Sequence, residues 1–261
     1  IERKCKIRYL SAMQSKKSTD KVKLSRRDFI YRAGLAASAF TIVPRFVMGG
    51  NGYIAPSDTL YIAGIGVGGK GTSDLTGFAQ NKKAKIAFLC DVDDRQAAES
   101  RKNFPDAPYF KDFREMLDKE ASNIDAVSVS TPDHTHAVAA MAAMQRGKHV
   151  YVQKPLTYSI YEARMLAEAA RKYKVVTQMG NQFASADHVR RTKELVDAGM
   201  IGDVSRVITW TNRPVWPQGI PTHSGKFDIP SELSWDLWLG PAKKIDYNPA
   251  YHPFNWRGWW E

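Results

Sequence analysis

Three glycines, spaced as Gly66-x-Gly68-x-x-Gly71, stand between an apolar stretch and a helical pattern, and this feature constrains the fold most. The apolar stretch, residues 60–65, has the length and composition of a buried strand. Gly66 permits a tight turn where the strand ends, and Gly71 lets the helix pack close to the strand. A frame that begins at Gly64 also fits the spacing, but its turn would fall inside the strand. The spacing therefore predicts a strand, a tight turn and a helix.

A turn of this kind is typical of a dinucleotide site, because its backbone amides and the helix N-terminus can approach a pyrophosphate. The predicted cofactor-binding residues of the turn are Gly66, Val67, Gly68, Gly69 and Gly71. The next predicted strand ends in Asp91, whose carboxylate can accept hydrogen bonds from the adenosine ribose. That carboxylate would repel a 2′-phosphate, which favours NAD over NADP, whereas Arg95 would tolerate the phosphate. The alternative is that the glycines serve only a turn and Asp91 only caps a helix.

Short apolar runs alternate with helical stretches over residues 56–180, which is typical of a parallel sheet with helices on both faces. The expected strands are residues 60–65, 85–91, 124–131, 149–152 and 175–180. One expected helix begins near Thr72, and the others cover residues 93–103, 113–120, 134–148 and 159–174. Gly147 should end the helix over residues 134–148. The fold class is therefore α/β, with a doubly wound parallel sheet of the Rossmann type.

The pattern changes after this sheet, over residues 181–261. A helix over 187–199 and a long strand over 203–212 precede loops rich in Trp, Pro and Gly. We expect this part to be the start of a second, incomplete domain.

The first fifty residues form a separate, basic segment. They hold 12 of the 38 Lys and Arg residues but 3 of the 27 Asp and Glu residues, whereas the remaining 211 residues hold 26 and 24. The basic excess is therefore not on the folded surface, which argues against a nucleic-acid partner. Arg26 and Arg27 precede a short, alanine-rich apolar run, a pattern typical of a twin-arginine export signal. We expect residues 1–50 to be this leader, with a periplasmic location and membrane contact only through the export machinery; the alternative is a surface helix.

A further predicted strand ends in the polar turn "STPDHTH". Because ligands of open α/β sheets lie beyond the carboxyl ends of strands, we expect Thr131, Pro132, Asp133 and His136 to face the cofactor. Asp133 is also placed to cap a helix that begins at His134. Two histidines two positions apart point in different directions on a helix, so we expect no metal site. The alternative is a solvated first helical turn.

Lys154 follows the predicted strand 149–152 and precedes Pro155. A lysine at the end of an inner strand has to leave water in part, so a neighbouring group must use its charge or its proton. A positioned amine can orient a substrate hydroxyl and share its proton while the carbon loses hydride to a nicotinamide. This role favours a partly buried Lys154 with a lowered pKa. The alternative is a plain surface lysine.

The stretches "GVGGKG", "CDVD", "STPDHTH" and "VYVQKPLT", in this order and spacing, resemble the Gfo/Idh/MocA oxidoreductases over about residues 58–261. The leader and the tryptophan-rich tail resemble the exported bacterial branch of that family. The resemblance implies a Rossmann domain, then an α/β domain with an open, mostly antiparallel sheet that supports homo-oligomers. It also implies NAD(P)-dependent chemistry on sugars, polyols or their derivatives.

The family's Glu-Lys-Pro motif falls on Gln153, Lys154 and Pro155. The resemblance therefore gives Lys154 the catalytic role beside the nicotinamide and places Gln153 and Lys154 among the cofactor-binding residues. The neutral amide of Gln153 replaces a carboxylate, which predicts a lower lysine pKa than in relatives with glutamate.

By family position, Asn181, Gln182 and Arg257 are the predicted substrate residues, with structural loop roles as the alternative. The chain ends at Glu261, before the Asp-x-x-x-His motif that carries the family's usual catalytic histidine. We therefore expect a C-terminally truncated protein that binds the dinucleotide in part and does not turn over.

Three functions fit these observations. The first is an NAD(P)-dependent oxidoreductase that oxidises or reduces a hydroxyl or keto group of a sugar, polyol or glycoside, with NAD preferred over NADP. The second is a glycoside-cleaving enzyme that oxidises a ring hydroxyl transiently, eliminates the aglycone and returns the hydride. The third is a non-catalytic protein that binds a dinucleotide or a sugar.

Overall fold

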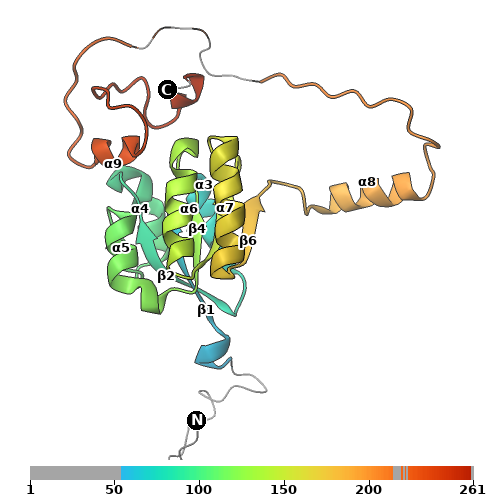
Figure 1. The fold of residues 1–261 in the computed structure, drawn as a ribbon, viewed down its shortest axis with the longest axis horizontal. Helices are drawn as coiled ribbons and strands as arrows, with labels where there is room; N and C mark the ends of the chain where they lie inside the picture. Colours follow the sequence, from blue (N-terminus) through green and yellow to red (C-terminus); the bar gives the residue numbers. More distant parts are fainter. Residues whose placement is uncertain (1–53, 214–218, 220, 222, 260–261) are drawn as a thin grey trace, which may run out of the picture.

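The computed structural model describes residues 54–213, 219, 221 and 223–259, so the predicted export leader, residues 1–50, lies outside the described residues. Its centre is a six-stranded sheet with the order β3-β2-β1-β4-β5-β6, in which every pairing is parallel (Figure 1). The strands are β1 (Leu60–Ile65), β2 (Ala84–Cys90), β3 (Tyr109–Phe110), β4 (Ala126–Val129), β5 (His149–Gln153) and β6 (Thr177–Gly180). The predicted doubly wound α/β fold is therefore confirmed. Strands β2 and β3 are added on one side of β1 and strands β4 to β6 on the other, so the strand order changes direction between β1 and β4.

Helices cover both faces of this sheet (Figure 1). On one face lie α3 and α4, and on the other lie α5, α6 and α7. These helices are α3 (Lys70–Ala79), α4 (Asp94–Asn103), α5 (Phe113–Glu120), α6 (His136–Gln145) and α7 (Ile160–Tyr173). The short 3-10 helices are η1 (Pro56–Asp58), η2 (Ala121–Asn123), η3 (Asp133–Thr135) and η4 (Asn255–Gly258).

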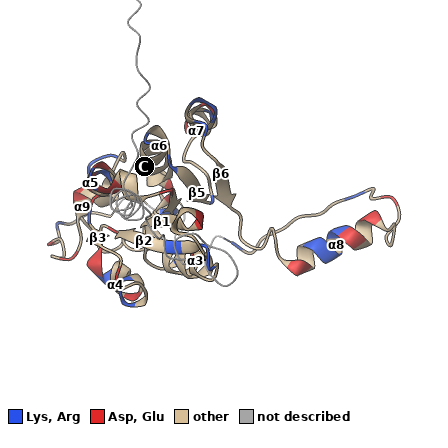
Figure 2. Cartoon of the chain, turned by 90° about the horizontal axis from the view of Figure 1, so that it is seen from below, with Lys and Arg blue, Asp and Glu red and all other residues tan. Residues whose placement is uncertain are grey.

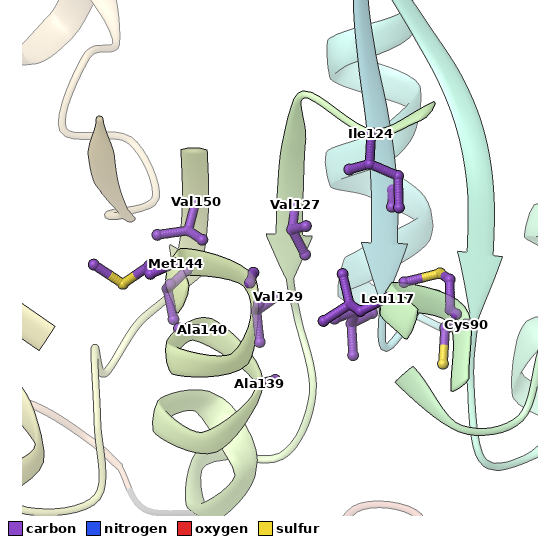
Figure 3. Packing of buried hydrophobic residues seen from close by; sticks show 14 of the residues in the cluster. Cys90, Leu117, Ile124, Val127, Val129, Ala139, Ala140, Met144 and Val150 are labelled. Atoms are coloured by element: carbon purple, nitrogen blue, oxygen red, sulfur yellow. The ribbon is translucent and has the colours of Figure 1, made fainter. Parts of the chain in front are cut away.

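Alternating side chains of the strands fill two apolar cores. In β1, Ile62 packs toward α3 and α4, whereas Ala63 and Ile65 pack toward α5, α6 and α7. The second core is the larger one, and Figure 3 shows how Val127 and Val129 of β4 meet the alanine-rich side of α6. Burial on both faces explains why the strands are nearly continuous apolar runs.

The helix boundaries follow from local chemistry. At the start of α7, Ser159 and Glu162 form a capping box in which each side chain accepts a hydrogen bond from the other's backbone amide. Gly147 has a φ of 73° and follows Arg146, the C-cap of α6, as predicted for a left-handed helix end. The predicted N-cap at Asp133 is wrong, because the 3-10 turn η3 comes first and Thr135 is the N-cap of α6.

The predicted strand over residues 203–212 is also wrong. Residues 203–213 have no regular structure and are exposed throughout. A strand needs a neighbour to accept and donate its ladder hydrogen bonds, and no described segment pairs with this one. The preceding helix, α8 (Asp187–Asp197), is present as predicted, carries charges of both signs and extends away from the sheet (Figures 1 and 2).

A later segment, residues 230–259, folds back onto the carboxyl edge of the sheet. It contains α9 (Trp235–Leu239), which the sequence analysis missed, and a core of aromatic and leucine side chains that also covers Val92. Two backbone hydrogen bonds join it to the chain just after β2. The amide of Asp94 donates to the carbonyl oxygen of Glu232 at 3.1 Å, and the amide of Ser234 donates to that of Val92 at 2.9 Å. We call residues 230–259 the docking segment. No helix among the described residues is long and apolar enough to cross a bilayer.

Candidate dinucleotide site and adjoining cleft

The glycine turn between β1 and α3 is packed tightly against the loop that follows β4. Gly66 has a φ of 76°, and a Cβ added there would lie 2.7 Å from the backbone nitrogen of Thr131. A Cβ added at Gly71 would lie 1.9 Å from the carbonyl oxygen of Gly66. Only glycine at these two positions allows α3 and the β4 loop to come so close to the end of β1.

The open side of the turn lies at Gly69. This residue precedes α3 with a φ of 51°, and a Cβ there would meet no atom within 4 Å. No side chain caps α3, so a ligand can take that place, and the helix dipole favours a negative group there. Gly68 differs, because a Cβ there would lie 2.7 Å from Cβ of Gln96 on α4. The residues present therefore fit a diphosphate at Gly69 and the start of α3.

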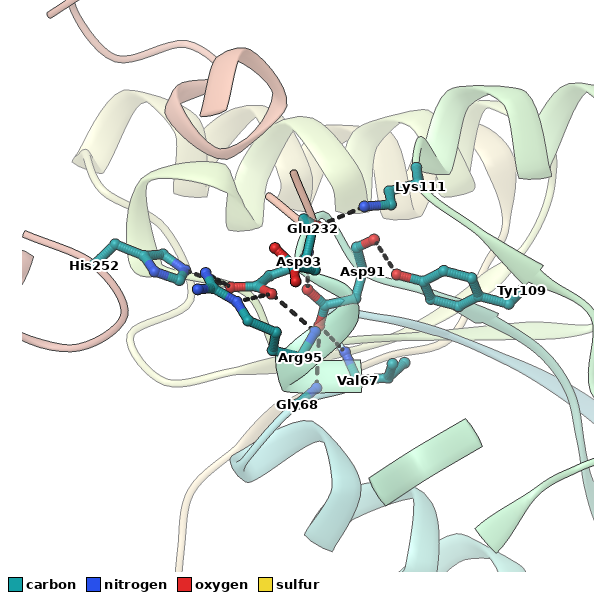
Figure 4. A network of polar contacts seen from close by, with 9 residues as sticks. All are labelled: Val67, Gly68, Asp91, Asp93, Arg95, Tyr109, Lys111, Glu232 and His252. Atoms are coloured by element: carbon teal, nitrogen blue, oxygen red, sulfur yellow. Dashed lines mark hydrogen bonds and ion pairs between the residues drawn. The ribbon is translucent and has the colours of Figure 1, made fainter. Parts of the chain in front are cut away.

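Asp91 holds the glycine turn from the end of β2 (Figure 4). Its Oδ2 accepts hydrogen bonds from the amides of Val67 and Gly68 at 2.8 and 3.1 Å, and its Oδ1 accepts one from the amide of Asp93 at 3.0 Å. Burial raises the pKa of the Asp91 carboxyl, and these hydrogen bonds oppose part of the rise. The Val67 and Gly68 amides are therefore engaged by Asp91 in this structure, and their contact with the diphosphate stays a prediction. A carboxylate has about four lone-pair sites, so Asp91 can still accept a ribose hydroxyl.

His136 joins the loops that follow β4 and β5. Its Nε2 lies 2.9 Å from the carbonyl oxygen of Thr131, its Nδ1 lies 2.7 Å from that of Pro155, and its side chain is buried. With both ring nitrogens facing carbonyl oxygens, His136 has no nitrogen to offer a ligand, which corrects its prediction as a cofactor contact. Thr131, Pro132 and Asp133 are partly exposed on the first of these loops.

A buried carboxylate that the sequence analysis missed lies between α3 and the ends of β4 and β5. Asp74 accepts hydrogen bonds from Lys70 Nζ at 2.6 Å, Ser130 Oγ at 2.9 Å and Gln153 Nε2 at 2.8 Å. We call these four residues the Asp74 cluster. Gln153 points into it and is buried, so it does not present its amide to the cofactor as predicted. The available signal was an aspartate next to Leu75 on the buried face of a predicted helix.

Lys154 lies at the carboxyl end of the inner strand β5, as predicted, but its side chain is exposed. Gln153, the last residue of β5, is buried, whereas Lys154, the next residue, is exposed. The expected partial burial of Lys154 is therefore wrong for this structure. The lysine loop is nevertheless fixed, because His136 ties Pro155 to the loop that touches the glycine turn.

A cleft of about 1480 Å³ opens between the docking segment and the loops after β4 and β5. Its lining includes Asp133, His134, Trp238, Trp256 and Arg257, and we call it the aromatic cleft. The guanidinium of Arg257 lies 4.4 Å from the Trp256 ring centroid and 3.6 Å from Asp133 Oδ1. One predicted substrate residue, Arg257, is thus part of a cleft at the sheet edge where ligands of this fold bind.

The other two predicted substrate residues, Asn181 and Gln182, are exposed beyond β6 and take no part in the lining of the aromatic cleft. A second cavity, of about 890 Å³, lies at the amino ends of the strands and contains no predicted site residue. Its position at the opposite edge separates it from the glycine turn and from Lys154.

His134 is a titratable group in the lining of the aromatic cleft. Its Nε2 lies 3.0 Å from the carbonyl oxygen of Trp238, and its ring meets the Trp238 and Trp256 rings edge to face. Burial lowers the pKa of His134, although this hydrogen bond and Asp133 oppose the change. A neutral imidazole therefore joins the docking segment to the loop after β4.

The comparisons with known proteins agree with this geometry. Residues 60–181 match the family model GFO_IDH_MocA, described as an oxidoreductase family with an NAD-binding Rossmann fold. Residues 60–181 are therefore similar to this family. The predicted family resemblance and the predicted cofactor, NAD, are confirmed for these residues, and when bound NAD supplies the hydride acceptor or donor.

Named relatives match over longer stretches. The chain is 28% identical over 207 residues to a glycosyl hydrolase family 109 protein from Shewanella pealeana, covering 70% of this chain and 45% of that protein. It is 27% identical over 147 residues to levoglucosan dehydrogenase from Pseudarthrobacter phenanthrenivorans, covering 56% and 35%. Scyllo-inositol dehydrogenase from Lactobacillus casei, solved with NAD(H) and scyllo-inositol, is 28% identical, with a TM-score of 0.51 and coverage of 56% of this chain and 43% of that one. The chain spans less than half the length of these three proteins.

Proposed function

We propose that the chain carries the NAD-binding part of an oxidoreductase that acts on a hydroxyl or keto group of a sugar, polyol or glycoside. The observation that carries this proposal is the placement of Lys154 on a loop that His136 ties to the glycine turn. Relatives named for levoglucosan and inositol oxidation support the substrate class. The proposal includes export through the twin-arginine route and assembly as a homo-oligomer.

In this proposal, Lys154 acts on the substrate oxygen. Its exposed amine orients a hydroxyl and shares the proton that leaves as the adjacent carbon loses hydride. His136 and Pro155 hold the lysine loop in place, and Asp91 holds the glycine turn that binds the other end of the cofactor. His136, Pro155 and Asp91 therefore position the lysine loop and the glycine turn in this proposal.

The aromatic cleft supplies the chemistry that a sugar requires. The ring of Trp256 offers a flat apolar face, and the guanidinium of Arg257 offers several hydrogen-bond donors beside the carboxylate of Asp133. Arg257 is therefore the proposed substrate residue that has structural support. Asn181 and Gln182 remain predictions from family position.

A glycoside-cleaving activity is the second candidate. The observation that favours it is the match to a glycosyl hydrolase family 109 protein, which extends over 70% of this chain. In that reaction the hydride returns to the sugar, so NADH does not accumulate while the aglycone is released.

The test compares wild type with Lys154→Met, as the 261-residue chain and as the complete gene product. NAD+ is supplied with inositols, levoglucosan and aryl glycosides, and both NADH and free aglycone are followed. NADH from a free polyol supports the dehydrogenase, and aglycone without net NADH supports glycoside cleavage. Lys154→Met should keep NAD+ affinity and lose turnover by roughly 10²–10⁴-fold.

The matched control is Lys148→Met, directly before the amino end of the same strand, which should leave turnover unchanged. Full turnover in Lys154→Met would refute the assigned role of the lysine. NAD+ and sugar binding without either product, in the complete gene product, would favour the non-catalytic alternative.

A further inference from the structure

Arg95 lies beside the part of the site that receives the adenosine ribose (Figure 4). It is in the first turn of α4, two residues after Asp93, which donates its amide to Asp91 at 3.0 Å. The residue after it, Gln96, packs directly against Gly68 of the glycine turn. A guanidinium at this position has the charge and the forked geometry to bind a 2′-phosphate. On charge alone, Arg95 would weaken the preference for NAD that Asp91 sets.

The Asp93 carboxylate binds the Nε–Nη2 edge of this guanidinium with both of its oxygens. Arg95 donates Nε to Asp93 Oδ1 at 2.9 Å and Nη2 to Asp93 Oδ2 at 2.7 Å, and its backbone amide also donates to Oδ1 at 2.9 Å. The Asp93 side chain is 1% exposed, whereas that of Arg95 is 44% exposed. The carboxylate is therefore the fixed member of the pair, and the arginine is drawn to it.

Three contacts keep Asp93 in this place. It caps α4, it forms a backbone bridge with Leu233 of the docking segment, and its Oδ2 lies 3.4 Å from Nε2 of His252. Burial alone would raise the pKa of Asp93, but the hydrogen bonds and charge of Arg95, together with His252, bring it below its ordinary value. The carboxylate is ionised at neutral pH and cannot turn away from Arg95.

We propose that the Asp93–Arg95 pair is a selectivity clamp for NAD over NADP. Asp93 satisfies the guanidinium in the first α4 turn, and the Asp91 carboxylate is then left to exclude the 2′-phosphate. When Asp93 loses its charge, Arg95 becomes able to bind the phosphate as a two-pronged donor. From its sequence position, Arg95 is expected to tolerate the 2′-phosphate of NADP. In the folded protein its guanidinium is bound by Asp93, which favours NAD instead.

The test is Asp93→Asn, with NAD+ and NADP+ dissociation constants measured by calorimetry on the whole chain. Asparagine keeps an oxygen that accepts from the Arg95 amide, so α4 stays capped. We expect NADP+ to bind about tenfold tighter than to wild type, because a charge-assisted contact forms at a partly exposed site. NAD+ affinity should change by less than about threefold, since the ribose contact to Asp91 is kept.

The chain contains a matched control for this substitution. Asp112 caps α5, on the other face of the sheet from α3 and α4, and binds Arg114 through the same three hydrogen bonds, at 2.9, 3.0 and 2.7 Å. Asp112→Asn should leave both dissociation constants unchanged. Adding Arg95→Ala to Asp93→Asn should remove the gain in NADP+ affinity.

Several outcomes would overturn the proposal. These are no gain in Asp93→Asn, the same gain in Asp112→Asn, and a gain that survives Arg95→Ala. If Asp93→Asn fails to fold, as circular dichroism would show, Arg95→Ala alone decides the question. A clamped arginine predicts an unchanged ratio of NAD+ to NADP+ affinity in that variant, and a NADP+ affinity that falls several-fold would show that Arg95 already binds the phosphate.

Discussion

Replacing Gln153 by glutamate would place two carboxylates against each other in the Asp74 cluster. In the wild-type protein Gln153 Nε2 donates to Asp74 Oδ2 at 2.8 Å, and both side chains are buried. The substitution removes the donor and adds a charge within the same volume. We therefore expect Gln153→Glu to destabilise this chain, although glutamate is the residue of the family motif.

The size of the effect follows from charge, distance and proton uptake. Two like charges about 4 Å apart repel by ~4 kcal/mol at an effective dielectric constant of about 20. Protonation sets an upper limit, since a carboxyl with an ordinary pKa of about 4.3 takes up a proton at pH 7 for ~3.7 kcal/mol. Lys70 Nζ, 2.6 Å from Asp74 Oδ1, offsets part of the repulsion, but its side chain is 38% exposed and screened. We expect a net loss of about 2–3 kcal/mol at neutral pH.

The pH dependence has a definite sign. The carboxyl that Gln153→Glu introduces would have a folded-state pKa above its unfolded value, so the protonated form is favoured by folding. Its penalty is therefore small below about pH 4, grows as the pH rises through the raised pKa and is complete above it.

The assay is urea unfolding at pH 5 and pH 7.5, with the free energy of unfolding compared between variants. Asp74→Asn/Gln153→Glu exchanges donor and acceptor and should recover most of the loss. Gln178→Glu, at an exposed site on the neighbouring strand β6, should stay within about 0.5 kcal/mol of wild type. If Gln153→Glu is as stable as wild type at pH 7.5, or equally destabilised at both pH values, the reasoning is wrong.

Two further predictions concern the glycine turn and the docking segment. Gly71→Ala should lower the free energy of unfolding by about 3 kcal/mol or more and abolish NAD+ binding, because the added Cβ would lie 1.9 Å from the carbonyl oxygen of Gly66. In the control Gly77→Ala, in the same helix, the added Cβ meets nothing within 4 Å, and the free energy of unfolding in urea should rise by about 0.5–1 kcal/mol. A stable Gly71→Ala that binds NAD+ would contradict this reasoning. Burial lowers the pKa of His134 below its unfolded value, so its contribution to docking is present above about pH 6.5 and lost as the pH falls below that value. Trp235, Trp238, Trp256 and Trp259 belong to the core of the docking segment, so tryptophan fluorescence should report this release. The change should be smaller in His134→Gln, and a signal that is flat between about pH 7 and pH 5 would argue against it.

The sheet and the glycine turn could be predicted because their signals are local. Period and spacing fix the geometry within a strand-turn-helix unit. The run 60–65 and the glycines after it belong to one such unit, and Asp91 ends the strand of the next unit. The Gly66 and Gly71 roles were predicted from spacing alone, and the close contacts at both positions agree with them.

The errors concern side chains whose partners are distant in the sequence. Gln153 and Asp74 are 79 residues apart, and the sequence gives no indication that they meet. His136 was interpreted by its place in a polar turn, but its burial between two carbonyl oxygens depends on how the β4 and β5 loops pack. The strand predicted over 203–212 had the right composition, and composition does not supply a pairing partner.

The docking segment links the two ends of the site. Its His252 contacts Asp93 at the ribose end, and Arg257, five positions later, contacts Asp133 in the aromatic cleft. Because one short segment makes both contacts, a change that releases it removes the support of the selectivity clamp and the wall of the cleft together. Loss of docking at low pH should therefore raise NADP+ affinity relative to NAD+ while it weakens any ligand of the cleft. A fixed NAD+ to NADP+ ratio across the fluorescence transition would show that the clamp holds without the segment.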